Sequence, residues 1–320
     1  MQTCTQIVAS KERVRLRGQP ASVDVVRVSD QRFRVTGGLV RTAELMDPWG
    51  EDVEDPAAVS RALKTGPLRV DLLKFWQRIP DTTPRYPYFH EWRYVAAIPI
   101  TTHRQWLGSQ ITQNARNKIR KAARHGVEVW EEELNDRLIR AIMEIYNESP
   151  LRRGRPFWHY GKDFETVKAE LSEDAEKSVF VTAYHAGELI GFIKFFVLDR
   201  YARTILVLDK MSRRDKAPMN SLISKVVEIC ERKGISHLVY SLWRRGNHGQ
   251  FQRSSGFIKT PVPEYWVPLT MRGRLTVLLR VHQGVKGWIP AKMMLQLLSI
   301  RAKWYAIRFG TEPFRFSDKQ

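Results

Sequence analysis

The chain has 320 residues, of which 43% are hydrophobic and 11% aromatic, a composition that excludes an intrinsically disordered protein. A net charge of +19 and a pI of about 10.1 favour polyanions as partners (nucleic acid, anionic lipid or phosphate-bearing substrates), although a plain solvated basic surface has the same signature. Two cysteines, Cys4 and Cys230, exclude a disulfide framework or a metal cluster built on cysteine, so we predict a cytoplasmic protein without a metal.

The beginning of the chain is polar and basic. Residues 1–20 lack the apolar core of a signal peptide, and we expect them to form a poorly ordered basic tail. No run of about 18 uncharged apolar residues occurs anywhere, so no transmembrane segment is predicted.

Residues 21–108 are expected to form a small α+β module. Alternating residues on both sides of a short polar turn indicate a hairpin near its start. A strongly apolar stretch at 68–77 fits a strand or a helix equally well. The other predicted elements are hairpin strands at 23–28 and 32–35, a loop at 47–55, a helix at 56–64 and a strand at 91–100.

Residues 109–270 are expected to form a second and larger module. It opens with a helix at 112–124 that carries five cations in nine residues and no acid. The apolar residues of this helix share one face, and the cations take the remainder. We interpret Arg116, Arg120 and Lys121 as a polyanion track; the alternative is an ordinary solvated face.

A loop at 151–162 combines three arginines with a run of aromatic residues, after a predicted helix at 135–146. Loops of this composition often line a ligand cleft, although the rings could equally fill the core. The predicted substrate-cleft residues are Arg155, Trp158, His159 and Tyr160, joined by Arg253 from a helical turn near residue 250.

A meander then leads into a strand–helix–strand unit. Strands are predicted at 179–184, 189–198, 203–211 and 238–242, with a helix at 218–233. A basic turn precedes that helix, and helix N-termini attract phosphate or carboxylate. The predicted ligands for donor phosphates are Lys210, Arg213, Arg214, Lys216 and Asn220.

Three residues of this unit are candidates for catalysis. Asp209 ends a strand, where its carboxylate can accept a proton from an attacking amine. Lys194 lies on an apolar strand, where it either reaches past the apolar surface to solvent or faces a cleft and stabilises an oxyanion. Tyr240 is a weaker candidate for proton transfer.

Residues 271–320 form a basic amphipathic segment in which apolar residues alternate with arginines and lysines. Such a segment either packs on the body of the protein or lies on an anionic membrane, and we favour the body. Its marker residues are Trp288, Met293, Met294, Leu297, Leu298, Trp304 and Tyr305.

The order of elements from 127 to 270 resembles the GNAT acyltransferase fold, and the local sequence resembles its FemAB-like branch. The resemblance lies in RNKIRKAARHGVEV (116–129), ELIGFIKFFV (188–197) and GQFQRSSGF (249–257). It implies an α+β fold with a mixed β-sheet flanked by helices, in two tandem modules of which the first is degenerate. It also implies transfer of an acyl or aminoacyl group to an amine, with aminoacyl-tRNA or acyl-CoA as donor.

The chain departs from the acetyl-CoA-binding members at the basic turn. Those members carry Arg/Gln-x-x-Gly-x-Gly/Ala there, whereas this chain has Lys216 and Pro218 in place of the glycines. Both residues limit the approach of a phosphate to the backbone. Two alternatives stay open: an N-acetyltransferase that uses acetyl-CoA, and a non-catalytic scaffold that binds RNA or an anionic membrane surface.

Overall fold

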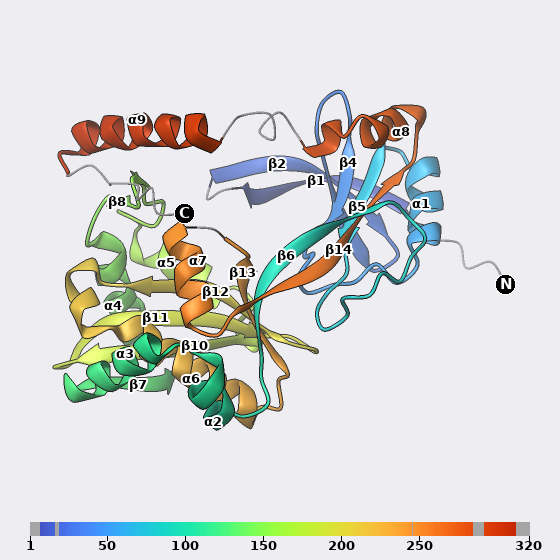
Figure 1. Cartoon of the computed structure of the whole chain (residues 1–320). Coiled ribbons are helices and arrows are strands. Elements are labelled where there is room, and N and C mark those ends of the chain that lie inside the picture. Colours follow the sequence, from blue (N-terminus) through green and yellow to red (C-terminus); the bar gives the residue numbers. More distant parts are fainter. Residues whose placement is uncertain (1–6, 17–18, 245, 284–290, 312–320) are drawn as a thin grey trace. The chain divides into compact units, whose positions relative to one another are not determined.

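The computed structural model describes residues 7–16, 19–244, 246–283 and 291–311 (Figure 1). The chain forms two compact units: unit 1 comprises 1–93 and 261–290, and unit 2 comprises 94–260 and 291–320. The divisions fall inside β6 (His90–Pro99) and β14 (Ile258–Pro268), away from the expected boundaries at 108/109 and 270/271. Strand pairing, rather than continuity along the chain, decides which unit a segment joins.

Unit 1 contains a sheet with the strand order β1-β2-β3-β4-β5-β14. The expectation of a disordered tail at residues 1–20 is wrong for β1, which pairs with β2 along its whole length. Edge strands tolerate the charges of β1 because one side of the strand faces solvent. The strands are β1 (Ile7–Leu16), β2 (Gln19–Val28), β3 (Gln31–Thr36), β4 (Thr42–Leu45) and β5 (Leu72–Trp76).

A strand–helix–strand unit lies at the centre of unit 1. The strands β4 and β5 pair in parallel and are connected through α1 (Pro56–Thr65). The helix begins where Asp55 accepts a hydrogen bond from the Ala58 amide at 2.8 Å, and its buried face contributes Val59 and Leu63 to the core. The undecided stretch at 68–77 therefore contains a strand, β5, which pairs with β4 on one side and with β14 on the other.

Unit 2 contains a sheet with the strand order β6-β13-β12-β11-β10-β7. All its pairs are antiparallel except β12–β13, and α6 connects that parallel pair. The strands are β7 (Val127–Glu132), β10 (Ser178–His185), β11 (Glu188–Val197), β12 (Ala202–Asp209) and β13 (His237–Leu242). The main helices are α3 (Gln113–Arg124), α4 (Asp136–Asn147), α5 (Phe164–Ser172), α6 (Pro218–Arg232), α7 (Gly246–Ser254) and α9 (Ala291–Phe309).

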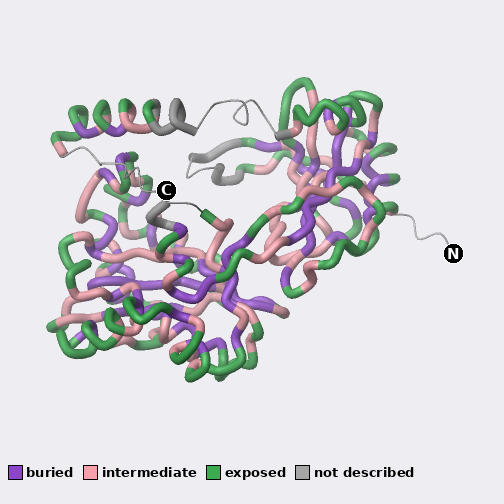
Figure 2. Tube along the Cα trace, in the orientation of Figure 1, coloured by how far each residue is buried: buried purple, intermediate pink, exposed green. Residues whose placement is uncertain are grey.

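Helices cover both faces of the unit 2 sheet, and its strand β11 is largely buried (Figure 2). On one face, α3 and α6 pack against residues such as Ile190 and Ile193 of β11; on the other, α4 and α5 pack against Phe192. Cys230 lies fully buried on the inner side of α6, as its helical spacing predicts. The predicted α+β fold, with a mixed sheet flanked by helices, is confirmed.

The C-terminal segment divides between the units. Helix α8 (Met271–Leu278) belongs to unit 1, whereas α9 belongs to unit 2 and lies against the hairpin of β8 (Leu151–Arg152) and β9 (Arg155–Pro156). Ala302 and Ala306 of α9 are buried. The marker residues Trp288, Met293, Met294 and Leu297 lie outside the residues whose side chains are described.

Candidate functional site

The parallel strands β12 and β13 separate after a short paired region. Their register comprises only Ala202 with Leu238 and Arg203 with Val239. Beyond it, Thr204 Oγ1 donates to the Tyr240 carbonyl at 2.7 Å in place of a backbone bond. The pairing of β12 with β11 is irregular at the same level, and such bulges bend a strand. The two strands therefore diverge toward their carboxyl ends, where α/β proteins commonly bind ligands.

Asp209 and Tyr240 lie at this divergence. Asp209 ends β12 and forms an ion pair with Arg214, whose Nε is 3.2 Å from Oδ2. Burial and the nearby Asp209 carboxylate raise the pKa of Tyr240 to about 12. Tyr240 therefore holds its proton at neutral pH, within electrostatic reach of Asp209.

The predicted phosphate ligands of the basic turn are bonded to carboxylates. Lys210 is nearly buried and bonds Glu144 at 3.0 Å and Glu188 at 2.7 Å. The other cations are also paired, Arg213 with Glu188, Arg214 with Asp209 and Lys216 with Asp215. Asn220 is buried in the first turn of α6. A phosphate would have to displace these partners.

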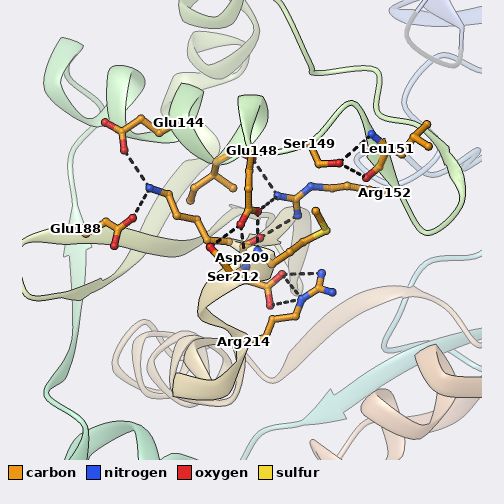
Figure 3. A network of polar contacts seen from close by, with 12 residues as sticks. Glu144, Glu148, Ser149, Leu151, Arg152, Glu188, Asp209, Ser212 and Arg214 are labelled. Carbon is orange, nitrogen blue, oxygen red and sulfur yellow. Dashed lines mark hydrogen bonds and ion pairs between the residues drawn. The ribbon is translucent and has the colours of Figure 1, made fainter. Parts of the chain in front are cut away.

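The Glu148 carboxylate binds the backbone amide groups at the start of this turn (Figure 3). Its carboxylate accepts hydrogen bonds from the Met211 amide at 2.6 Å and from the Ser212 amide and hydroxyl at 2.8 and 2.7 Å. Burial raises the pKa of Glu148, but these hydrogen bonds outweigh it, so the pKa lies below its ordinary value. The carboxylate also pairs with Arg152 at 3.4 Å. An acid of the chain itself thus binds the amides at the start of the basic turn.

Lys194 does not face a cleft. Its side chain is 2% exposed, and Nζ donates to the carbonyls of Leu171 at 2.9 Å and Glu173 at 2.8 Å, at the C-terminal end of α5. A cation there satisfies carbonyl groups that the helix leaves without partners. The geometry gives Lys194 a structural role and lends its predicted oxyanion role no support.

The aromatic loop divides into buried and exposed parts. His159 is buried against Tyr146 and Trp158, with ring centroids 4.2 and 3.7 Å away. Burial lowers the pKa of His159 to about 3, so the ring is neutral and belongs to the core. Trp158 and Tyr160 are about half exposed, and Arg155 is exposed.

Arginines from separate segments gather around the divergence. Partial burial, followed by the positive charges of Arg301 and Arg244, lowers the pKa of Arg155, so arginines from α9, from the loop after β13 and from the β8–β9 hairpin lie within electrostatic reach of it. Arg152 donates to the Asp209 carbonyl at 2.9 Å. We call this set the arginine cluster; it comprises Arg152, Arg153, Arg155, Arg214, Arg244 and Arg301.

Sequence reasoning overlooked four members of the arginine cluster and also Glu148. One signal was available, because the tripeptide Arg-Arg-Gly occurs twice, at 152–154 and at 244–246. Glu148 gave none, since a glutamate at the end of an amphipathic helix is ordinary. Arg253, predicted in the cleft, is exposed on α7.

The predicted polyanion track on α3 needs one correction. Arg116 donates to the carbonyls of Leu107, Gly108 and Ile111 at 2.9–3.1 Å, so it holds the preceding turn together. Arg120 and Lys121 are exposed, and neither forms an ion pair within the part of the chain that the structure describes.

Replacing both exposed residues, Arg120→Glu with Lys121→Glu, is expected to weaken RNA binding and to flatten its salt dependence. Each lost phosphate contact lowers the slope of log K against log salt by about one, so the slope should fall by roughly two. Filter binding at several salt concentrations measures it. Arg116→Glu is the matched comparison and should instead lower the melting temperature. An unchanged slope in the double variant would show that Arg120 and Lys121 belong to an ordinary solvated face.

The described residues contain neither a metal-binding cluster nor a membrane-spanning helix. No cluster of three or more histidine, cysteine or carboxylate side chains is arranged to hold a metal ion. No helix among the described residues is long and apolar enough to span a membrane.

Comparison with known proteins places the fold. Neither family models nor curated proteins match the sequence. Among solved structures, FemX is similar with a TM-score of 0.54 at 10% identity, over 85% of this chain and 90% of FemX. A second similar structure is the C-terminal DUF2156 domain of a protein from Agrobacterium fabrum that is described as a lysylphosphatidylglycerol synthetase. Its TM-score is 0.52 at 12% identity, over 79% of this chain and 86% of that domain. L-PGS from Bacillus licheniformis is similar with a TM-score of 0.51 at 12% identity, over 79% of this chain and 86% of L-PGS. The chain therefore shares its fold with FemX and with these two proteins, as the resemblance to FemAB-like proteins predicts.

Proposed function

We propose that unit 2 transfers an aminoacyl group from a tRNA to an amine, with the divergence of β12 and β13 as the donor site. The observation that carries this choice of donor is Glu148. Its carboxylate bonds the amides of Met211 and Ser212 at the start of the basic turn, so these amides are not free to bind a donor phosphate. A donor held by its pyrophosphate at these amides is therefore disfavoured.

The arginine cluster supports a donor with many phosphates. The charges of Arg301 and Arg244 act on Arg155 although like charges repel, so an anion bound beside Arg155 would be stabilised. The net charge of +19 would steer a polyanion such as tRNA toward the protein. The name of one fold neighbour, lysylphosphatidylglycerol synthetase, also describes an aminoacyl transfer.

Asp209 and Tyr240 suit the two proton transfers of the reaction. The amine nitrogen attacks the ester carbonyl carbon, a C–N bond forms, and the bond from that carbon to the ribose oxygen breaks. The Asp209 carboxylate accepts the proton that the amine loses, directly or through water. Tyr240, whose pKa of about 12 keeps it protonated, donates to the departing oxygen.

Donor preference is the expected result that tests this proposal. Aminoacyl-tRNA should bind and transfer its aminoacyl group to a simple amine, while acetyl-CoA should bind with a Kd well above about 10 µM, weaker than about −7 kcal/mol. Arg155→Gln with Arg244→Gln should weaken tRNA binding at least tenfold and leave the melting temperature unchanged, since both side chains are exposed.

Calorimetry and a transfer assay with radiolabelled amino acid provide the measurements. Tight acetyl-CoA binding with acetyl transfer would favour the N-acetyltransferase alternative. Binding of tRNA without any transfer to amines would favour the non-catalytic scaffold.

A further inference from the structure

Helix α8 presents a row of exposed apolar side chains. Met271, Leu275 and Leu278 of the helix follow at positions i, i+4 and i+7, a spacing that places them on one face, and Leu279 and Val281 come directly after the helix. Figure 2 shows most of this helix as exposed. A contiguous apolar row of this kind marks an interaction surface. The side chains and their exposed fractions are Met271 (66%), Leu275 (52%), Leu278 (77%), Leu279 (67%) and Val281 (60%).

The opposite face of α8 is anchored to unit 1, which prevents the helix from turning its apolar row inward. Thr270 caps the helix and donates to Asp71 Oδ1 at 2.8 Å. Gly273 lies so close to the Asp71 carbonyl that any Cβ would collide with it. Beyond the helix, His282 is buried with its ring centroid 4.6 Å from that of Trp266. The apolar row is therefore held outward at both ends.

Arginines flank the apolar row. Arg272, Arg274 and Arg280 are exposed, and the sequence from 271 to 283 contains no acid. None of the three forms an ion pair with a carboxylate among the residues that the structure describes. Apolar side chains and unpaired cations thus share one exposed surface.

Two neighbouring features extend this surface. Leu39 is 87% exposed, and its carbonyl accepts a hydrogen bond from Arg69, which in turn pairs with Asp71 beneath the start of α8. Beside Thr270 lies a cavity of about 350 Å³, with Lys64 and Arg69 among its lining residues. Arg69 is paired with Asp71, but Lys64 forms no ion pair among the described residues, so this hollow offers a cation to an anionic headgroup next to an apolar row.

We infer that this face of unit 1, formed by α8, Leu39 and the flanking arginines, docks on an anionic lipid surface. Aliphatic side chains enter the boundary between headgroups and acyl chains while the arginines contact phosphates, and the two contributions act together. Nucleic acid would satisfy the arginines but leave the leucines in water. A second copy paired by a two-fold axis would bring arginines against arginines with no acid to compensate. The inference is independent of acyl transfer, because it concerns a surface outside the candidate site.

Flotation with vesicles tests this inference. The full chain should float with vesicles of phosphatidylcholine and phosphatidylglycerol and not with phosphatidylcholine alone. Leu275→Ser, Leu278→Ser and Leu279→Ser together should lower the partition coefficient at least tenfold. Arg272→Gln, Arg274→Gln and Arg280→Gln together should lower it about fivefold for each arginine at low salt.

The matched control is a pair of equally exposed aliphatic residues on α9. Ile300 and Ile307 are 65% and 83% exposed, so Ile300→Ser with Ile307→Ser removes similar surface from another helix. This control should float like the wild type, and all variants should melt at the wild-type temperature. No flotation of the wild type, undiminished flotation of the leucine variant, or an equal loss in the α9 control would each overturn the assignment to α8.

Discussion

Tyr240→Phe is expected to lower kcat for aminoacyl transfer by about 10²-fold while leaving the Kd of the donor unchanged. The reason is that proton donation to the leaving oxygen occurs only in the transition state, and a positioned general acid contributes on the order of 10²–10⁴ to a rate. Single-turnover kinetics with saturating donor measures this loss without the influence of binding.

A matched control is Tyr184→Phe. Tyr184 lies in β10, bonds Glu132 at 2.9 Å and also has its pKa raised to about 12, by burial and by that hydrogen bond. It lies outside the proposed site, so its loss should leave kcat within about twofold of the wild type. In the wild type, kcat should also show no fall up to about pH 10, because a Tyr240 pKa of about 12 keeps the acid protonated. Equal rates for the two variants would remove Tyr240 from the mechanism.

Glu148→Gln is expected to destabilise unit 2 by about 3 kcal/mol, because the carboxylate of this partly buried residue makes several charge-assisted hydrogen bonds that an amide cannot all replace. The glutamine cannot accept from both amides and the Ser212 hydroxyl, and Arg152, 9% exposed, loses its ion pair. For a unit of this size, the melting temperature should fall by roughly 6–12 °C, as calorimetry will detect.

The neighbouring acid Glu144 is the control. Its carboxylate also forms a hydrogen-bonded ion pair, with Oε2 3.0 Å from Lys210 Nζ, but its side chain is 66% exposed. Exposed pairs contribute below about 1 kcal/mol, so Glu144→Gln should shift the melting temperature by no more than about 4 °C. Similar shifts in both variants would mean that the Glu148 contacts add nothing beyond an ordinary surface pair.

The pH dependence of stability follows from the same residue. Because hydrogen bonds hold the folded-state pKa of Glu148 below its ordinary value of 4.5, the folded protein binds this proton less readily than the unfolded chain. Its contribution is fully present above about pH 4.5 and is lost as the pH falls through the lowered pKa. Between pH 7 and pH 3, therefore, the gap in melting temperature between wild type and Glu148→Gln should narrow; a constant gap would contradict the role of the charge.

The sequence by itself determined the elements of unit 2 and much of its fold. Helix α6 begins at Pro218 and α4 follows the cap Asn135, as predicted, because caps and helical periodicity act over a few residues. The approach of Asp209 to Tyr240 was also predictable in outline, since both lie near the ends of a parallel strand pair. Local signals were sufficient wherever the deciding contacts lie within one or two turns.

Only the tertiary structure decided what each charge contacts. A lysine on an apolar strand looks the same whether it faces a cleft or, like Lys194, the end of another helix more than 20 residues away. Glu148 reaches the turn at Ser212 across 64 residues, and β1 is a strand because β2 lies beside it. The ion-pair partner of a charge and the hydrogen-bonding partner of an edge strand both come from distant parts of the chain. The pattern of neighbouring residues therefore cannot reveal which partner each has.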